Sequence, residues 1–140
     1  MSKPLLPTLA LVLACAFPAF ALAGSDGSDP ASVVTRHATA FAAHDVDALM
    51  RDYADDVVAV LPDKVIQGKS ELRGWFVGYF ASPGPVFQAS LAKVEGDVGF
   101  THWVANPGAA GAVQGYDVFV LRGGKIAFQT SMGVGPLVAK

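Results

Sequence analysis

The spacing of apolar residues changes near residue 85, from a helical period before it to strand-like alternation after it. Asp29 and Pro30 favour the start of a first helix, because an acceptor side chain caps the free amides and proline fits the first turn. We expect this helix to reach about His44. Its inward stripe contains Val34, His37, Ala38 and Phe41.

Two more helices are predicted before the change of period. The second is short, at about residues 48–54, with Leu49 and Tyr53 as its buried pair. A short strand at 57–62 and a brief one at 65–67 follow it. The third helix spans about 71–81 and is strongly amphipathic, with apolar residues at Leu72, Trp75, Phe76, Tyr79 and Phe80.

The remainder of the chain alternates as strands. The pattern predicts four of them, at about 86–94, 98–105, 113–122 and 126–134, separated by glycine-rich turns. Helices come first and a meander of strands follows, and this segregated order predicts an α+β fold. We expect an antiparallel sheet with the helices packed on one of its faces.

The last two strands form the most informative stretch, YDVFVLRGGKIAFQTSM from Tyr116 to Met132. Gly123-Gly124 predicts a two-residue hairpin turn, because both central residues of a type I′ turn need a positive φ. Counting outward from the turn pairs Leu121 with Ile126, Phe119 with Phe128, and Asp117 with Thr130. That face of the hairpin would line an apolar pocket containing one acid. The opposite face, with Val118, Val120 and Ala127 beside Tyr116 and Gln129, suits a homodimer contact.

The N-terminus predicts export. Lys3, an apolar run and the site Ala21-Leu22-Ala23 are typical of a secretory signal peptide over residues 1–23. A flexible leader (24–30), one domain (31–135) and a short tail (136–140) would follow, in a periplasmic or secreted protein. The alternative is a lipoprotein processed at Cys15, whose preceding residues match a lipobox poorly.

Charge and composition exclude several functions. The net charge is −2 and no basic block occurs, so nucleic acid is not expected as a partner. The three histidines have no zinc-like grouping, and no glycine-rich phosphate loop is present, so no metal and no cofactor are expected. Prolines interrupt the N-terminal apolar run, which argues against a membrane span.

The motifs AFAAHDVDALMRDYADDVVAVLPDKVIQGKSELRGWF and YDVFVLRGGKIAFQ resemble the NTF2-like superfamily, and most of all its SnoaL-like and ketosteroid-isomerase-like branch. The resemblance covers about residues 31–134. It implies a strongly bent sheet wrapped around three helices, a cone with an apolar cavity, and dimerisation through the sheet.

The resemblance also permits a comparison of catalytic positions. The oxyanion-binding tyrosine of the isomerases corresponds to His37, and their assisting aspartate to Asp117. Their proton-moving aspartate corresponds to Leu61, and Asp63 is two residues beyond it. The SnoaL-like cyclases carry a His-Trp-Asp run where this chain has Gln129-Thr130-Ser131. Whether the domain is an enzyme is therefore left open.

Three hypotheses follow: a module that binds a small apolar or carbonyl-bearing molecule, an isomerase, cyclase or dehydratase that uses Asp117 and His37, or a dimerisation domain. In the alternating run around residue 102, either His102 or Trp103 faces the pocket, but not both. The expected ligand-contacting residues are Tyr53, Trp75, Tyr79, His102, Trp103, Phe119, Phe128 and Thr130.

Overall fold

The computed structural model describes residues 27–82 and 84–136. The predicted signal peptide, Cys15, the first residues of the leader and residues 137–140 lie outside the described residues. No helix in the described ranges is long and apolar enough to cross a membrane.

Two of the three helices precede the first strand, and the third follows the second strand. Helix α1 (Pro30–Ala42) begins as predicted, with the Asp29 carboxylate accepting a hydrogen bond from the Ser32 amide at 3.0 Å. Helix α2 (Val46–Asp52) is capped by Asp45 and ends earlier than predicted, because Tyr53 already belongs to the first strand. Leu49 and Tyr53 are nevertheless both buried. Helix α3 spans Lys69–Ala81.

Six strands form one sheet in the order β2-β1-β6-β5-β4-β3. They are β1 (Tyr53–Leu61), β2 (Lys64–Gln67), β3 (Phe87–Glu95), β4 (Val98–Ala105), β5 (Val113–Arg122) and β6 (Lys125–Pro136). Every pair is antiparallel except β1 and β6, which run parallel, so the sheet is mixed where an antiparallel one was predicted. The meander from β3 to β6 ends with β6 beside β1 and running in the same direction, a long-range pairing that local patterns do not contain.

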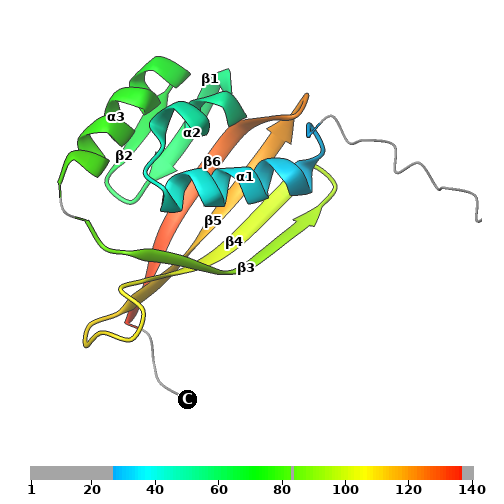
Figure 1. The fold of residues 1–140 in the computed structure, drawn as a ribbon. Coiled ribbons are helices and arrows are strands. Elements are labelled where there is room, and N and C mark those ends of the chain that lie inside the picture. The colour runs from blue at the N-terminus through cyan, green and yellow to red at the C-terminus, as the bar shows by residue number, and fades with distance from the viewer. Residues whose placement is uncertain (1–26, 83, 137–140) are drawn as a thin grey trace, which may run out of the picture.

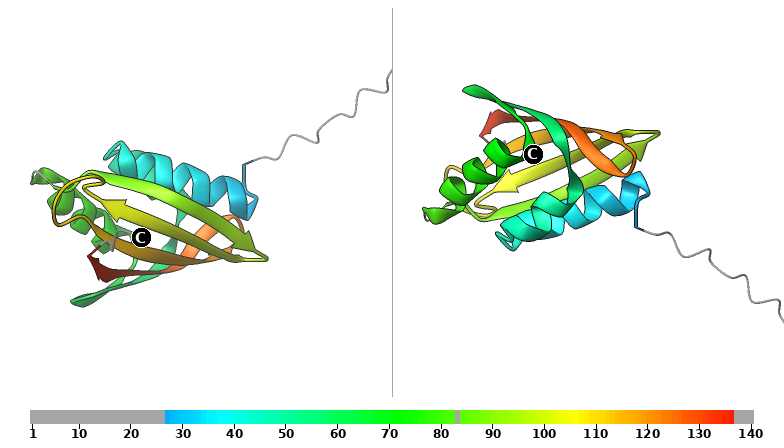
Figure 2. Two further views of the ribbon diagram at one scale, coloured as in Figure 1. Left: turned by 90° about the horizontal axis from the view of Figure 1, so that it is seen from below. Right: turned by 90° about the horizontal axis from the view of Figure 1, so that it is seen from above.

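The sheet is strongly curved, and the helices lie on its concave side (Figures 1 and 2). This is the predicted α+β cone. Its core is shared by α1, α2, α3 and the concave face, and includes Val33, Val34, Leu49, Leu72, Phe76, Phe119 and Ile126. Gly99 lets α1 approach β4 closely, since a Cβ there would lie 2.5 Å from Val34 Cγ2.

The β5–β6 hairpin follows the predicted register only near its turn. Gly123 and Gly124 have φ values of 58° and 72°, and Leu121 pairs with Ile126, as expected. A β-bulge at Ala127 then shifts the register, and Val120 pairs with Phe128. A shift of one residue exchanges the two faces of a strand.

The consequence of the bulge is a correction to the predicted pairs. Phe119 pairs with Gln129, and Asp117 pairs with Ser131. Phe128 and Thr130 therefore share the convex face with Val118 and Val120, and do not line the pocket.

Candidate functional site

A cavity of about 70 Å³ lies between α1, α3 and the concave face of the sheet. Most of its wall is apolar and aromatic, from Phe41, Leu61, Leu72, Trp75, Phe76, Phe87 and Trp103. Ala42 on α1 and Ala89 on β3 also line it and are exposed, so the cavity reaches the surface between these two elements. Five polar side chains complete the lining: His37, Thr101, Asp117, Gln129 and Ser131.

Asp117 is the centre of the polar part of the wall. Thr101 Oγ1 on β4 donates to Asp117 Oδ2 at 3.3 Å, and the carboxyl group also accepts hydrogen bonds from the side chains of Ser131, Trp103 and Gln129. Burial raises the pKa of Asp117 above its ordinary value, and these hydrogen bonds oppose that rise without cancelling it. The two strands on either side of β5, β4 and β6, thus supply its partners. The predicted partner Thr130 is not among them, because the bulge places it on the other face.

His37 forms part of the wall from α1. Its side chain is 3% exposed, and its ring centroid lies 4.9 Å from that of Phe119 and 5.5 Å from that of Tyr53. Burial lowers its pKa to about 4, so the imidazole is neutral at pH 7. The buried Nδ1 atom has no hydrogen-bond partner. Such an unsatisfied atom costs about 1–3 kcal/mol, and a polar group on a ligand would relieve that cost.

Tyr53 lies behind the wall of the cavity. It is 1% exposed, does not line the cavity, and donates its hydroxyl hydrogen bond to Gln129 Oε1. Burial raises its pKa well above the ordinary value, with the charges of Asp117 and Asp52 adding to the effect. Because Tyr53 occupies the amide oxygen of Gln129, the amide nitrogen is left to donate to Asp117. Tyr53 is thus a positioning residue, where a ligand contact was predicted.

The other predicted ligand contacts fall into two groups, those that line the cavity and those that do not. Trp75 and Trp103 line the cavity, and Phe119 is fully buried beneath His37. Tyr79 does not line it, but stacks on Trp75 with ring centroids 4.9 Å apart. His102 is on the convex face, where its Nε2 lies 3.0 Å from Gln114 Oε1. The structure thus selects Trp103 over His102.

Sequence reasoning missed Thr101, Gln129 and Ser131. Strand alternation carried a signal for Thr101, because it is two residues before Trp103 and shares its face. The cyclase comparison marked Gln129 and Ser131 as counterparts of catalytic positions, but the strand pattern put Gln129 on the opposite face, because their orientation depends on the bulge.

In the folded protein, an apolar side chain occupies the position that corresponds to the proton-moving aspartate of the isomerases. Leu61 lines the cavity, whereas the Asp63 side chain is 72% exposed and pairs with Lys64 at 3.4 Å. Asp117 and His37 are the only ionisable side chains among the described residues that line the cavity. In the same part of the chain, no cluster of three or more His, Cys, Asp or Glu side chains is arranged to hold a metal ion.

Comparisons with known proteins agree with this architecture. Residues 34–129 match the family model of the SnoaL-like domain, so the chain belongs to that family, within the NTF2-like superfamily. Among curated proteins, no sequence matches significantly.

Several solved structures share the fold. An NTF2-like protein of unknown function from Burkholderia xenovorans LB400 is 22% identical, with a TM-score of 0.65 over 77% of this chain and 84% of that one. A SnoaL-like protein of unknown function from Burkholderia thailandensis E264 is 18% identical, with a TM-score of 0.62 over 73% and 92%. A protein with a ketosteroid isomerase-like fold from Catenulispora acidiphila DSM 44928, in complex with trimethylamine, is 22% identical, with a TM-score of 0.61 over 71% and 83%. At these identities the likeness establishes the fold alone.

Proposed function

We propose that the domain binds a small, mostly apolar molecule that carries a carbonyl or similar hydrogen-bonding group. The observation that supports this most is the arrangement of the cavity. Its aromatic wall suits an apolar body, while its polar side chains include a buried carboxyl group and an imidazole with an unpartnered nitrogen. Burial raises the pKa of Asp117, which favours its protonated form, and a protonated carboxyl group would donate a hydrogen bond to a ligand oxygen.

The volume limits the size of this ligand. The cavity measures about 70 Å³, and an engineered apolar cavity that binds benzene measures roughly 150 Å³. A steroid-sized ligand therefore does not fit unless side chains at the opening move. We accordingly favour a ligand with a single small ring or a short branched chain, part of which extends past Ala42 and Ala89.

The two tryptophans provide a direct test, because the chain has only two and both line the cavity. The indole N–H signals of Trp75 and Trp103 are followed by NMR during titration with cyclohexanone, and separately with the hydrocarbon methylcyclohexane. We expect saturable shifts of both signals and tighter binding of the ketone. In Asp117→Leu the preference for the ketone should disappear, a loss of up to about tenfold for one neutral hydrogen bond.

The convex-face variant Thr130→Val is the control and should bind like the unmodified protein. If neither compound shifts either indole signal, no such binding site exists. A preference for the ketone that survives in Asp117→Leu would show that Asp117 does not recognise the carbonyl.

A second candidate is an isomerase, cyclase or dehydratase in which Asp117 and His37 act together. It is favoured by one observation: their pKa values shift toward one another, upward for Asp117 and downward to about 4 for His37. These shifts favour a protonated carboxyl group and a neutral imidazole in one cavity, an acid and a base that would suit proton transfer. Incubation with cyclohexanone in D₂O tests it, since an enzyme would catalyse deuterium uptake beside the carbonyl, and His37→Phe and Asp117→Asn would each abolish that uptake. Binding without uptake supports the binding module.

We also propose that the domain forms a homodimer through the convex face of the sheet. Val98, Val120 and Met132 there are 47%, 39% and 57% exposed, and large apolar side chains exposed together on one face suit an association surface. Sedimentation velocity at micromolar concentration should show a dimer, and Val120→Lys should convert it to a monomer. A monomer for the unmodified protein would contradict the proposal.

Export remains a prediction from residues 1–23. Sequencing the N-terminus of the protein isolated from the periplasm or culture medium should give Gly24 as its first residue. An acylated Cys15 would instead indicate the lipoprotein.

A further inference from the structure

Tyr53, Gln129 and Asp117 form a chain of buried hydrogen bonds that leads from behind the cavity to its polar wall. The Tyr53 hydroxyl group donates to Gln129 Oε1, and the Gln129 side chain donates to the Asp117 carboxyl group. Tyr53 and Gln129 are 1% and 6% exposed. Of the three residues, Gln129 and Asp117 line the cavity. The Tyr53 hydroxyl group can therefore act on a ligand through Gln129.

The fold brings Tyr53 and Gln129 together although they are 76 positions apart in the chain. Tyr53 begins β1 and pairs with Ile126 of the parallel strand β6. The bulge at Ala127 then turns Gln129 to the concave face, where the Tyr53 side chain is buried. The hydrogen bond between them thus depends on the parallel strand pair and on the bulge.

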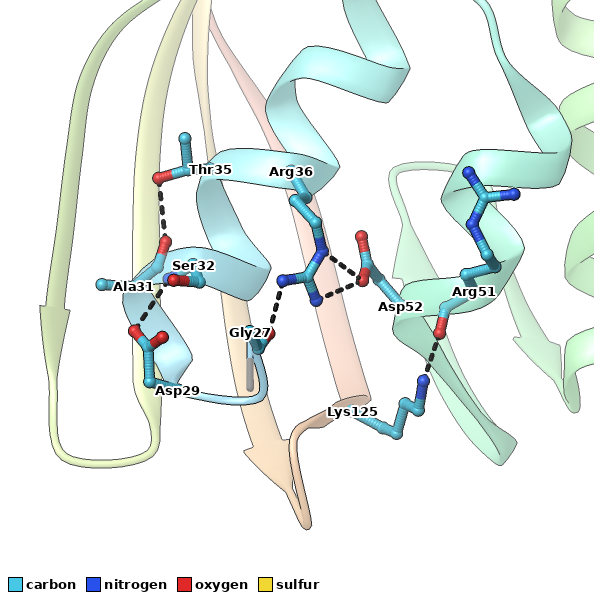
Figure 3. Close-up of polar contacts among 9 residues, drawn as sticks. All are labelled: Gly27, Asp29, Ala31, Ser32, Thr35, Arg36, Arg51, Asp52 and Lys125. Atoms are coloured by element: carbon cyan, nitrogen blue, oxygen red, sulfur yellow. Dashed lines mark hydrogen bonds and ion pairs between the residues drawn. The ribbon is translucent and has the colours of Figure 1, made fainter. Parts of the chain in front are cut away.

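The chain just before Tyr53 is held from two sides (Figure 3). Arg36 of α1 binds the Asp52 carboxylate, with Nη2 2.8 Å from Oδ1, and Lys125 from the β5–β6 turn donates to the Arg51 carbonyl. Supporting contacts of this kind keep a side chain in one geometry. They fix the position from which Tyr53 reaches Gln129.

The Tyr53 hydroxyl group remains a hydrogen-bond donor. Burial raises the pKa of Tyr53 well above its ordinary value, and the negative charges of Asp117 and Asp52 raise it further. The hydroxyl group therefore keeps its hydrogen, which needs an acceptor inside the protein. Gln129 Oε1 is that acceptor.

This bond decides which way the Gln129 amide group faces. An amide has an oxygen that accepts and a nitrogen that donates, and half a turn exchanges them. The reversed amide would take the acceptor away from the Tyr53 hydroxyl group and place an oxygen against the Asp117 carboxyl group. An unmet buried donor lowers the population of an arrangement about fivefold or more. With Tyr53 present, the amide nitrogen therefore faces Asp117.

The hydrogen bonds around Asp117 all point toward it. The side chains of Ser131, Trp103, Thr101 and Gln129 donate to its carboxyl group. These bonds use the lone pairs of the carboxyl oxygens and leave the hydrogen of its protonated form for an acceptor in the cavity. A ligand that accepts this hydrogen completes the network, whereas a hydrocarbon leaves it unmet.

We propose that Tyr53, acting through Gln129, makes the cavity select ligands that accept a hydrogen bond. In Tyr53→Phe the amide of Gln129 loses the contact that orients it, and its oxygen turns to accept the hydrogen of Asp117. The ligand then loses its donor although Asp117 is still present. This inference rests on the function proposed for the cavity, and assigns its selectivity to a positioning residue behind the wall.

The test measures the ketone preference, which is the dissociation constant of methylcyclohexane divided by that of cyclohexanone, from the indole signals of the two tryptophans. Tyr53→Phe should lower this ratio by up to about tenfold, the effect of one neutral hydrogen bond. Tyr79→Phe is the matched control and should keep the ratio, because Tyr79 stacks on Trp75 but does not line the cavity.

A double variant decides whether Tyr53 acts through Gln129. Adding Gln129→Leu to Tyr53→Phe should raise the ketone preference again, by about threefold or more, because no amide oxygen remains to take the Asp117 hydrogen. A purely structural role of the Tyr53 hydroxyl group would give the double variant a preference no higher than that of Tyr53→Phe. Circular dichroism verifies that each variant is folded.

A titration without ligand provides a second measurement. The pKa of Asp117, followed by carboxyl ¹³C NMR, should rise in Tyr53→Phe, because Gln129 no longer donates the hydrogen bond that lowers it. When Gln129→Leu is already present, adding Tyr53→Phe should leave this pKa unchanged. A loss of packing alone would move the titration in both cases.

A ketone preference that is present in the unmodified protein and survives in Tyr53→Phe would overturn the inference and leave the proposed function standing. An Asp117 titration that is the same with and without the Tyr53 hydroxyl group would overturn it as well, as would a double variant with no recovery. If neither compound binds the unmodified protein, the proposed function fails, and the selectivity fails with it.

Discussion

The two faces of the β5–β6 hairpin come from one short stretch of sequence, yet their environments differ sharply. On the concave face Phe119 is fully buried, whereas its neighbour Val120 on the convex face is 39% exposed. Asp117, Gln129 and Ser131 line the cavity, where Asp117 accepts hydrogen bonds from the other two, while Thr130 and Met132 face outward. Residues next to each other in the sequence are thus in different environments. Inside the cone every polar group needs a partner, whereas outside it water supplies one.

His37 is the exception on the concave side, and it makes the comparison instructive. The acid in the cavity has a full set of hydrogen bonds, but the imidazole Nδ1 has none. The unpartnered imidazole nitrogen lowers the stability of the fold, and a ligand that bonds to it would remove that cost. The convex face has no comparable enclosed polar group among its described residues, and its chemistry suits association instead.

The largest expected difference between the faces is in packing. Phe119→Ala should lower the free energy of unfolding by about 3–5 kcal/mol, because it leaves a cavity in the core. Phe128→Ala, on the convex face, should cost at most about 2 kcal/mol, since its ring is only partly buried. Urea unfolding at a concentration where the protein is monomeric measures both. Equal losses would mean that the two faces are not distinct.

The next effect is a pH dependence specific to the concave face. The pKa of His37 is about 4 in the folded protein and about 6.5 in the unfolded chain, so the unfolded chain takes up a proton first as the pH falls. Its contribution to stability is present above pH 6.5 and is lost between pH 6.5 and 4, a change of about 3 kcal/mol. Urea unfolding across this range should show that slope, and His37→Phe should remove it.

Asp117 should change the pH dependence of stability in the opposite direction, and it serves as the control. Its raised pKa means that the folded state holds a proton that the unfolded state has released, so stability falls as the pH rises above 3.8. Asp117→Asn should therefore make the upward slope between pH 4 and 6.5 steeper. A shallower slope in that variant would contradict the assignment.

A third test uses paired glycines on β5 and β6. A Cβ at Gly115 would lie 2.2 Å from a Trp103 ring atom and 2.4 Å from the Met132 carbonyl oxygen, whereas one at Gly133 would meet nothing within 4 Å. Gly115→Ala should cost about 1–3 kcal/mol through overpacking and should shift the indole signal of Trp103. Gly133→Ala should be neutral or slightly stabilising, by less than about 1 kcal/mol. A neutral Gly115→Ala would show that Trp103 does not rest on that glycine.

The smallest effect tests the bulge itself. Ser131→Ala removes a hydrogen bond that lowers the pKa of Asp117, so it should raise that pKa further and cost about 1 kcal/mol. Thr130→Val should leave the Asp117 titration unchanged, because Thr130 is on the other face. Carboxyl ¹³C NMR measures both. If Thr130→Val instead moves the titration, the uninterrupted register predicted from the sequence is the correct one.

Much of the fold was predictable because its signals are local. Asp29-Pro30 marks the start of α1, the apolar spacing defines α3, and Gly123-Gly124 sets the hairpin turn, each through the conformational preferences of a few neighbouring residues. The family could be recognised for the same reason, since its motifs are short and stand in a set order. Asp117 and His37, the two catalytic candidates named from the sequence, both line the cavity.

The sequence by itself therefore determined the elements, the turn, the family and the two ionisable groups of the cavity. Only the tertiary structure decided which residues face inward. Side chains along a strand alternate between its two faces, but the sequence does not say which set faces inward. His102 and Trp103 were therefore equivalent candidates until helices covered one face of β4. The bulge at Ala127 likewise exchanged Phe128 and Thr130 for Gln129 and Ser131, because a strand's register depends on its pairing partner as well as on its own residues. The parallel pairing of β1 with β6 has the same origin, a contact between residues far apart in the chain.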